Sequence, residues 1–264
     1  MVTMRRYEEV VGAAARASDR SYLAPEIVRQ RMRVMELLAL RAGESVLDAG
    51  CGVGLLSEPM AREVGRGGRL VGVDVTADVL EKARKRCSGL DHTMFQQGSV
   101  ERLALDEAGF DAAVCTQVLL YVQDVPRALA ELYRVLKPGG RLVIVETDWA
   151  GTVLNSGMPS VTRRIIAGWD SVVASPNLPR TLAPKLRDAG FAAVRVEALP
   201  ILRTSVTPGD FVYSSLVSFA DEAPKRSDVS EQDAAAWRED LMQRQKDGAF
   251  FFCVNRFLFS AVKT

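Results

Sequence analysis

The sequence is poor in the residues from which metal sites, disulfide frameworks and histidine-based catalysis are recognised. It has one histidine, and its four cysteines are far apart, with no CxxC pair. This spacing predicts neither a zinc site nor a disulfide framework, and it is typical of a reducing compartment. The cysteines are Cys51, Cys87, Cys115 and Cys253, and the histidine is His92. Since His92 stands at the beginning of a predicted strand, we expect it at the surface rather than as a base, and we expect no metal.

The sequence also has no large excess of charge of one sign and no long apolar run. The formal net charge is +1, so the chain lacks the electrostatic footprint of a protein that binds nucleic acid or anionic lipid. The most apolar run, AFFFCVNRFLFSAV, is interrupted by Asn255 and Arg256 and is too short to span a bilayer. The N-terminal 20 residues lack the apolar segment of a signal peptide, and Glu8 and Glu9 argue against a transit peptide. We therefore expect a soluble cytoplasmic protein.

Strands and helices alternate in the central part of the chain. Short apolar runs at 45–50, 69–75, 92–98, 110–116 and 141–146 predict strands, and segments with helical spacing separate them at 55–65, 77–87 and 125–140. Alternation of this kind implies right-handed crossovers and a doubly wound parallel sheet. The strands are nearly all apolar, as expected when helices cover both faces.

The flanking segments are predominantly helical by pattern. We predict two helices within residues 5–41, and further helices at 156–173, 178–190, 208–223 and 231–247. Two more strands are predicted at 191–202 and 249–263. The 264 residues suit one large domain with additions rather than two domains.

The stretch VLDAGCGVG, residues 46–54, carries the clearest functional signal. It follows the first predicted strand, and ligands of doubly wound sheets bind at the carboxyl ends of the strands. Asp74 ends the second strand, about 20 positions after the glycines, where a carboxylate accepts hydrogen bonds from a ribose diol. The spacing therefore indicates a nucleoside-containing cofactor.

Two cofactors fit this arrangement. A dinucleotide requires G-x-G-x-x-G, but Leu55 occupies the third glycine position, and Asp48 would repel a pyrophosphate. Asp48 suits instead the ammonium group of S-adenosylmethionine (SAM), which has a ribose and no phosphate. An NAD(P)-dependent oxidoreductase stays open as the alternative, as does a purely structural tight turn.

Four segments resemble successive motifs of class I SAM-dependent methyltransferases. They are VLDAGCGVG, LVGVDVT, FDAAVCTQVLLYVQD and LYRVLKPGGRLVIVE, within residues 44–146. The resemblance is closest to the ubiquinone/menaquinone-biosynthesis C-methyltransferases and the small-molecule methyltransferases of secondary metabolism. It implies a Rossmann-like α/β fold, with a seven-stranded, mostly parallel sheet whose last strand is antiparallel. We expect a single methyltransferase domain, 1–264, in which 44–146 bind SAM. Because the segments 1–40, 150–176 and 205–248 are helical by pattern and join the sheet where the family places its lid, we expect 1–40 to form a helical cap and the other two to be helical lid insertions. Padding of the fold or a dimer interface is the other interpretation of these segments.

The resemblance also assigns contacts with SAM. Asp48, Gly50, Gly52 and Gly54 would surround the methionine part, Asp74 would hold the ribose, Val75 and Thr76 would pack beside the adenine, Ser99 and Val100 would contact its edge, Thr116 and Gln117 would lie next to the sulfonium, and Tyr22 would close over the cofactor. Many relatives have an aspartate in place of Ser99, so this contact is expected to be weaker here. Ordinary packing is an equal interpretation of Tyr22.

Transfer from SAM is an in-line displacement, so positioning carries much of the acceleration. Tyr121 and Asp148 are the catalytic candidates, and Tyr121 and Trp149 the candidates for contact with the acceptor. Core packing is the other interpretation of Tyr121 and Trp149, and a solvent-facing acid that of Asp148. Relatives often carry His or Glu where Leu119 and Leu120 stand, which favours an apolar acceptor pocket over base-dependent O-methylation.

We therefore expect a methyltransferase acting on a small, largely apolar metabolite by C-, O- or N-methylation, as a monomer or a homodimer, without a nucleic-acid partner. The sequence names neither the acceptor nor the atom that is methylated. A protein that binds SAM without transferring methyl is the remaining alternative.

Overall fold

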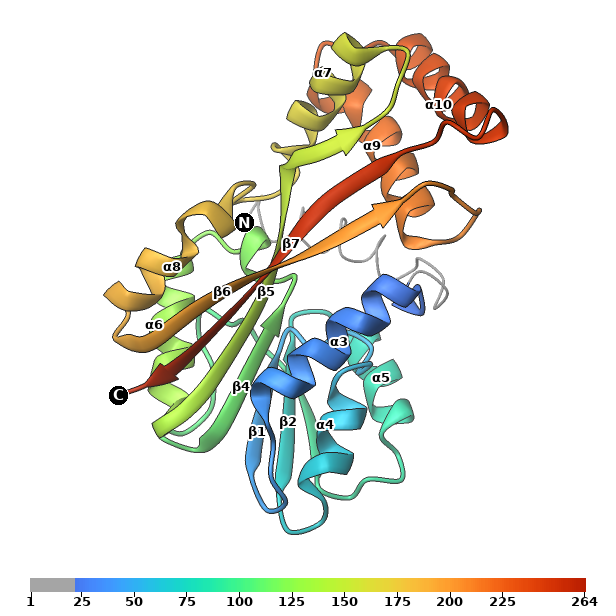
Figure 1. Cartoon of the computed structure of the whole chain (residues 1–264). Helices are drawn as coiled ribbons and strands as arrows, with labels where there is room; N and C mark the ends of the chain where they lie inside the picture. Colours follow the sequence, from blue (N-terminus) through green and yellow to red (C-terminus); the bar gives the residue numbers. More distant parts are fainter. Residues whose placement is uncertain (1–21) are drawn as a thin grey trace.

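The computed structural model describes residues 22–264, and it contains one seven-stranded sheet with the strand order β3-β2-β1-β4-β5-β7-β6 (Figure 1). The strands are β1 (Ser45–Ala49), β2 (Arg69–Asp74), β3 (Thr93–Gln97), β4 (Phe110–Thr116), β5 (Leu136–Leu154), β6 (Phe191–Arg203) and β7 (Phe252–Lys263). The first five are paired in parallel, whereas β7 runs antiparallel to both β5 and β6. The predicted Rossmann-like α/β fold is confirmed. Of the two helices predicted within 5–41, the part before residue 22 lies outside the described residues.

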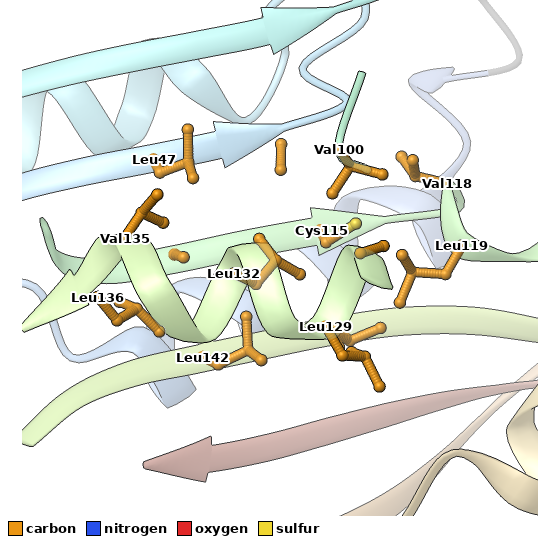
Figure 2. Packing of buried hydrophobic residues seen from close by; sticks show 14 of the residues in the cluster. Leu47, Val100, Cys115, Val118, Leu119, Leu129, Leu132, Val135, Leu136 and Leu142 are labelled. Atoms are coloured by element: carbon orange, nitrogen blue, oxygen red, sulfur yellow. The ribbon is translucent and has the colours of Figure 1, made fainter. Parts of the chain in front are cut away.

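Two groups of helices cover the two faces of the sheet. The helices are α3 (Pro25–Leu38), α4 (Ser57–Val64) and α5 (Ala77–Arg86) on one face, and α6 (Val125–Val135) and α8 (Leu178–Asp188) on the other. Neighbouring strand residues point to opposite faces, so Val46 packs under the first group and Leu47 under the second. Figure 2 shows the second face, where Leu129 and Leu132 of α6 belong to the same buried cluster as Cys115 of β4 and Leu142 of β5.

The remaining helices form a separate layer with its own core. They are α7 (Pro159–Trp169), α9 (Phe211–Arg226) and α10 (Glu231–Lys246). They pack against one another and against the carboxyl end of β5 and the amino end of β7, beyond the edge of the parallel sheet (Figure 1). Buried side chains bind them together, among them Trp169, Phe219 and Trp237. Among residues 22–264, no helix is long and apolar enough to cross a membrane.

Local chemistry explains where several of these helices begin. Pro25 occupies the first turn of α3, where its missing N–H is not needed. The side chains of Asp210 and Ser230 accept hydrogen bonds from backbone amides in the first turns of α9 and α10, at 2.7 and 3.0 Å. Such caps satisfy amides that have no partner inside the helix.

The boundaries predicted around β5 differ from those in the structure. The helix expected at 125–140 ends at Val135, and β5 begins at Leu136 instead of 141. Pro138 disfavours helical dihedrals at the residue before it. The chain therefore becomes extended before Gly139 and Gly140, where the predicted helix ended. At the other end β5 continues to Leu154, because its antiparallel partner β7 reaches beyond the parallel strands.

Candidate active site

The glycine loop after β1 is folded onto the end of β2. The amides of Gly50 and Cys51 both donate to the carbonyl of Val73, at 2.7 and 3.0 Å. Gly50 has a φ of +79°, and a Cβ at this position would lie 2.1 Å from Cγ2 of Val118, which follows β4. Glycine is therefore required here both by the left-handed backbone and by the close approach of the β4 loop.

Asp74, at the end of β2, holds this loop in place. Its Oδ2 accepts from the amide of Gly52 at 2.9 Å, and its Oδ1 accepts from the amide of Thr76 at 3.0 Å. Burial raises the pKa of Asp74, and the two amide hydrogen bonds oppose that shift. A carboxylate offers about four acceptor positions. Asp74 also lines the cavity described below, so its carboxylate can be reached by a ligand.

Asp48, at the same edge of the sheet, is almost completely buried, with 1% of its surface exposed. It accepts a hydrogen bond from Oγ of Ser57 at 2.5 Å. Burial raises its pKa to about 7, with a further contribution from the charge of Asp74, while Ser57 acts in the opposite direction. A cation placed beside Asp48 would restore its charged form.

A cavity of about 200 Å³ opens at the carboxyl ends of β1, β2 and β4. Seven of the residues predicted to contact SAM line it: Tyr22, Asp48, Gly50, Gly52, Asp74, Thr116 and Gln117. Five others do not line it: Gly54, Val75, Thr76, Ser99 and Val100. A Cβ on Gly54 would be 3.1 Å from Ala83 of α5, Val100 is part of the core, and Oγ of Ser99 accepts from the amide of Glu101 at 3.1 Å.

The turn after β4 is held by a buried acid of β5 that was not among the predicted site residues. Glu146 of β5 is fully buried, and its Oε1 accepts from the amides of Val118 and Leu119 at 3.1 and 2.7 Å. Burial raises its pKa to about 8, against the effect of these hydrogen bonds. Gln117 itself has a φ of 57°, and its side chain accepts from Thr147 at 2.6 Å. A lone acid at the end of an apolar strand was the available signal.

Tyr121, Asp148 and Trp149 do not line the cavity. Tyr121 lies in a single 3-10 turn, Leu119–Tyr121, and burial raises the pKa of its phenol. Asp148 forms a two-pronged ion pair with Arg180, with contacts of 2.9 and 3.1 Å. Trp149 packs edge-on against Phe219 at 5.4 Å between ring centroids. None of these three side chains therefore forms part of the cavity wall. Their roles in catalysis and acceptor binding stay predictions.

The wall of the cavity also contains residues from distant parts of the chain that were not predicted, among them Gln30, Arg31, Phe211 and Arg256. They come from α3, α9 and β7, elements far apart in the sequence. Arg256 donates from Nη1 to Oε1 of Gln30, and its guanidinium lies 4.7 Å from the ring centre of Phe211. The signal for Arg256 was its position inside the most apolar run of the chain.

The described part of the chain offers no group of three or more histidine, cysteine or acidic side chains that could hold a metal ion. His92 lies just before β3, with Nε2 2.8 Å from the carbonyl oxygen of Ala61. It is at the amino end of the strand, as predicted, and therefore at the opposite edge of the sheet from the cavity.

Comparison with known proteins gives a consistent result. Residues 47–144 match the family described as Methyltransferase domain. The chain is 30% identical over 211 residues to the 2-phytyl-1,4-naphtoquinone methyltransferase of Thermosynechococcus vestitus, a match that covers 74% of this chain and 92% of that protein. The chain spans about half the length of several other curated relatives that it matches.

Solved structures show the same fold. The crystal structure of the [4+2]-cyclase SpnF has a TM-score of 0.57 and 25% identity, and the match covers 89% of this chain and 80% of that one. A putative methyltransferase from Bacillus halodurans has a TM-score of 0.63 and 20% identity, with 89% and 99% covered. None of these comparisons supports an NAD(P)-dependent oxidoreductase. The chain belongs to the family of SAM-dependent methyltransferases, and SAM is its cofactor.

Proposed function

We propose that this protein transfers the methyl group of SAM to a small, largely apolar organic acceptor that binds in the same cavity, beyond the end of β4. The observation that carries the proposal is a cavity with two buried carboxylates, Asp48 and Asp74, at the carboxyl ends of adjacent strands. A relative that methylates a naphthoquinone, as its name states, supports an acceptor with an apolar ring.

The cavity fits SAM on grounds of charge. Among residues 22–264, neither Asp48 nor Asp74 has a cationic partner that lowers its pKa. Burying an ionised carboxylate without a cationic partner costs free energy, and a positively charged ligand would remove that cost. Asp48 would receive the ammonium group, and Asp74 the ribose hydroxyls. Bound SAM supplies an activated methyl group on a sulfonium sulfur.

The chain's own contribution is then position and the exclusion of water. Glu146 and the left-handed Gln117 hold the β4 turn, so that Thr116 and Gln117 present a fixed wall beside the sulfonium. Helices α7, α9 and α10, with α3, act as the cap expected from 1–40, 150–176 and 205–248. Such a cover excludes water from a reaction between charged groups.

In this proposal the residues that line the acceptor side of the cavity are supported from outside the cavity by Tyr121, Asp148 and Trp149. Trp149 stacks against Phe211, with 6.3 Å between the ring centroids and 25° between the planes, and Phe211 does line the cavity. Asp148 anchors Arg180 of α8. A change at Trp149 would therefore reach the acceptor through Phe211.

Ligand binding and product analysis test the proposal. SAM and its product S-adenosylhomocysteine (SAH) should bind in the micromolar range, about −8 kcal/mol, whereas NAD should not bind. If neither SAM nor SAH raises the melting temperature at millimolar concentration, the proposal is wrong. Mass spectrometry after incubation with methyl-labelled SAM and a metabolite extract of the source organism then identifies the acceptor. Binding of SAM without any labelled product would instead indicate a protein that uses SAM without transferring its methyl group.

A further inference from the structure

A buried cation faces the cavity from the side opposite the two carboxylates. Arg256 lines the cavity, yet only 5% of its surface is exposed. Nη1 donates to Gln30, and the guanidinium lies over the ring of Phe211. Among residues 22–264, Nε has no hydrogen-bond partner, and no carboxylate approaches the guanidinium within ion-pair distance. A buried charge left in this state is unfavourable unless a ligand completes it.

The nearest acid on the neighbouring strand does not fully neutralise this charge. Arg256 is paired in register with Thr147, so Glu146 is one residue away along β5. One oxygen of Glu146 is committed to two backbone amides, and the other has no partner in the described part of the chain. Burial raises the pKa of Glu146 to about 8 although the charge of Arg256 acts in the opposite direction, so Glu146 compensates Arg256 only in part. Glu26, which also faces Arg256, is paired with Arg203.

The cavity is therefore electrically polarised. Asp48 and Asp74 lie on β1 and β2, whereas Arg256 lies on β7, which follows β4 and β5 in the strand order. Three strand spacings separate the β1 and β7 backbones, about 14 Å. A ligand whose ammonium group and ribose are held by Asp48 and Asp74 would leave the β5–β7 side of the cavity, where Arg256 lies, for the acceptor.

We propose that Arg256 is the acceptor-binding residue, and that the acceptor carries an acidic oxygen which it binds as an oxyanion through Nε. This inference rests on the proposed function, because it assigns the Asp48–Asp74 side to SAM. The acceptor is then an apolar ring or chain with an enol, phenol or carboxyl group. The apolar part would contact Ile27, Val118 and Phe211, which line the same cavity.

The chemistry requires no base from the protein. The acceptor releases its proton to water before transfer, since the nearby guanidinium favours the ionised form. An electron pair of the oxyanion, or of a carbon conjugated with it, forms the bond to the methyl carbon. The carbon–sulfur bond breaks with its pair on sulfur, which leaves a neutral thioether. Among the described residues of the cavity wall, Asp48 and Asp74 are the only acids and histidine is absent, which is consistent with this route.

Binding of matched naphthalenes tests the inference without knowledge of the natural acceptor. The probes are 2-naphthoate, the ionised phenol 2,4-dinitro-1-naphtholate, and the neutral 2-methylnaphthalene, each titrated with and without saturating SAH. In the wild type, at least one anion should bind roughly tenfold or more tightly than the neutral probe, because its oxygen gains a charge-assisted hydrogen bond. Preference for the naphtholate indicates an enol or phenol acceptor, and preference for the naphthoate a carboxylic acid.

Two variants decide whether Arg256 is responsible. Arg256→Met keeps the bulk without the charge, and replacing a buried charge by an apolar side chain of similar size is often tolerated. It should lose the preference for the anion while SAH still binds. Arg256→Lys should keep part of it. Unchanged preference in Arg256→Met would overturn the inference.

A third ligand separates the acceptor from the cofactor. If Arg256 instead holds the carboxylate of SAM, Arg256→Met should lose affinity for SAH but not for 5′-methylthioadenosine, which lacks the amino-acid part. That result would also overturn the inference. Loss of anion preference in Arg256→Met, in a protein whose wild type fails to bind SAH, would contradict the proposed function alone and leave Arg256 as an oxyanion site.

Discussion

The carboxylate of Asp74 accepts a hydrogen bond from the amide of Gly52, with 2.9 Å between Oδ2 and the nitrogen. This bond joins the end of β2 to the loop after β1, so the residue expected to hold the ribose also shapes the loop expected to hold the methionine part. The cofactor site is therefore mechanically coupled, and a substitution at Asp74 acts on both contacts at once.

Asp74→Ala should weaken SAH by roughly 2–4 kcal/mol, because two charge-assisted hydrogen bonds to the ribose are lost. Isothermal titration calorimetry measures the change. 5′-Methylthioadenosine, which keeps the ribose, should lose a similar amount. Asp74→Asn is the matched control, since its amide oxygen can still accept from Gly52 and should retain part of the affinity. An unchanged dissociation constant in Asp74→Ala would place the ribose elsewhere.

Gly50→Ala should unfold or strongly destabilise the protein. The left-handed backbone costs about 1–2 kcal/mol for any other residue, and the new Cβ would in addition overlap Val118. Chemical denaturation compares it with Gly52→Ala, whose φ is +51° but whose Cβ would meet nothing within 4 Å. Gly52→Ala should therefore lose only about 1 kcal/mol. Adding Val118→Ala should recover part of the loss in Gly50→Ala, and equal effects of the two alanines would contradict the close-approach argument.

Asp48 should make the stability of the free protein depend on pH. Burial raises its folded-state pKa from 3.8 to about 7, so the folded state binds more protons than the unfolded state between these values. The stability that results from the raised folded-state pKa of Asp48 is fully present below pH 4 and is lost as the pH rises through 7. Its size is on the order of a few kcal/mol.

Asp48→Asn isolates this contribution, because the amide can still accept from Ser57. At pH 8 the variant should be more stable than the wild type, and at pH 4 the difference should be small. Denaturant midpoints across this range measure it, while Glu146 contributes equally to both proteins. The same variant should bind SAH more weakly and 5′-methylthioadenosine almost normally, since only SAH has the ammonium group. A parallel pH profile in both proteins would show that Asp48 is not the group that titrates.

The parts of this structure that the sequence predicts are those set by local rules. Apolar strands alternating with helices predict the parallel sheet, and the spacing of Asp48, the glycines and Asp74 predicts one side of the cavity, because these residues follow adjacent strands. All of them lie within 30 residues of one another in the chain, so their pairing depends on one β-α-β unit.

The other side of the cavity depends on contacts that no local pattern encodes. Gln30 and Arg256 meet although they are 226 positions apart, because α3 packs against β4 and β5, and β7 is the next strand of the sheet. Asp148 follows the predicted strand, but in the structure β5 continues through it, and its carboxylate forms an ion pair with Arg180 of α8. The cap segments were predicted as helices, yet which of their residues would face a ligand depends on how α9 packs against Trp149, and that is a tertiary property.

Trp149 offers a test of how the cap and the acceptor site are connected. It is buried among Trp169, Phe211 and Phe219, so Trp149→Ala should lower the free energy of unfolding by about 3–5 kcal/mol, whereas Trp149→Phe should lose less. Because Trp149 supports Phe211 but does not line the cavity, Trp149→Phe should weaken binding of 2-naphthoate or raise the KM for the acceptor, while the affinity for SAH stays within a few-fold.

Tyr121→Phe tests in the same way whether the turn after β4 affects the acceptor without affecting SAH binding. It removes only the hydroxyl, so it should preserve SAH binding while slowing methyl transfer if the phenol contacts the acceptor side of the site. Steady-state kinetics with the identified acceptor, and calorimetry with SAH, measure the two effects separately. A loss of SAH affinity in either variant would mean that the substituted side chain supports the cofactor rather than the acceptor. Normal turnover in both would mean that the acceptor does not lie on the side of the cavity that Phe211 and Arg256 form.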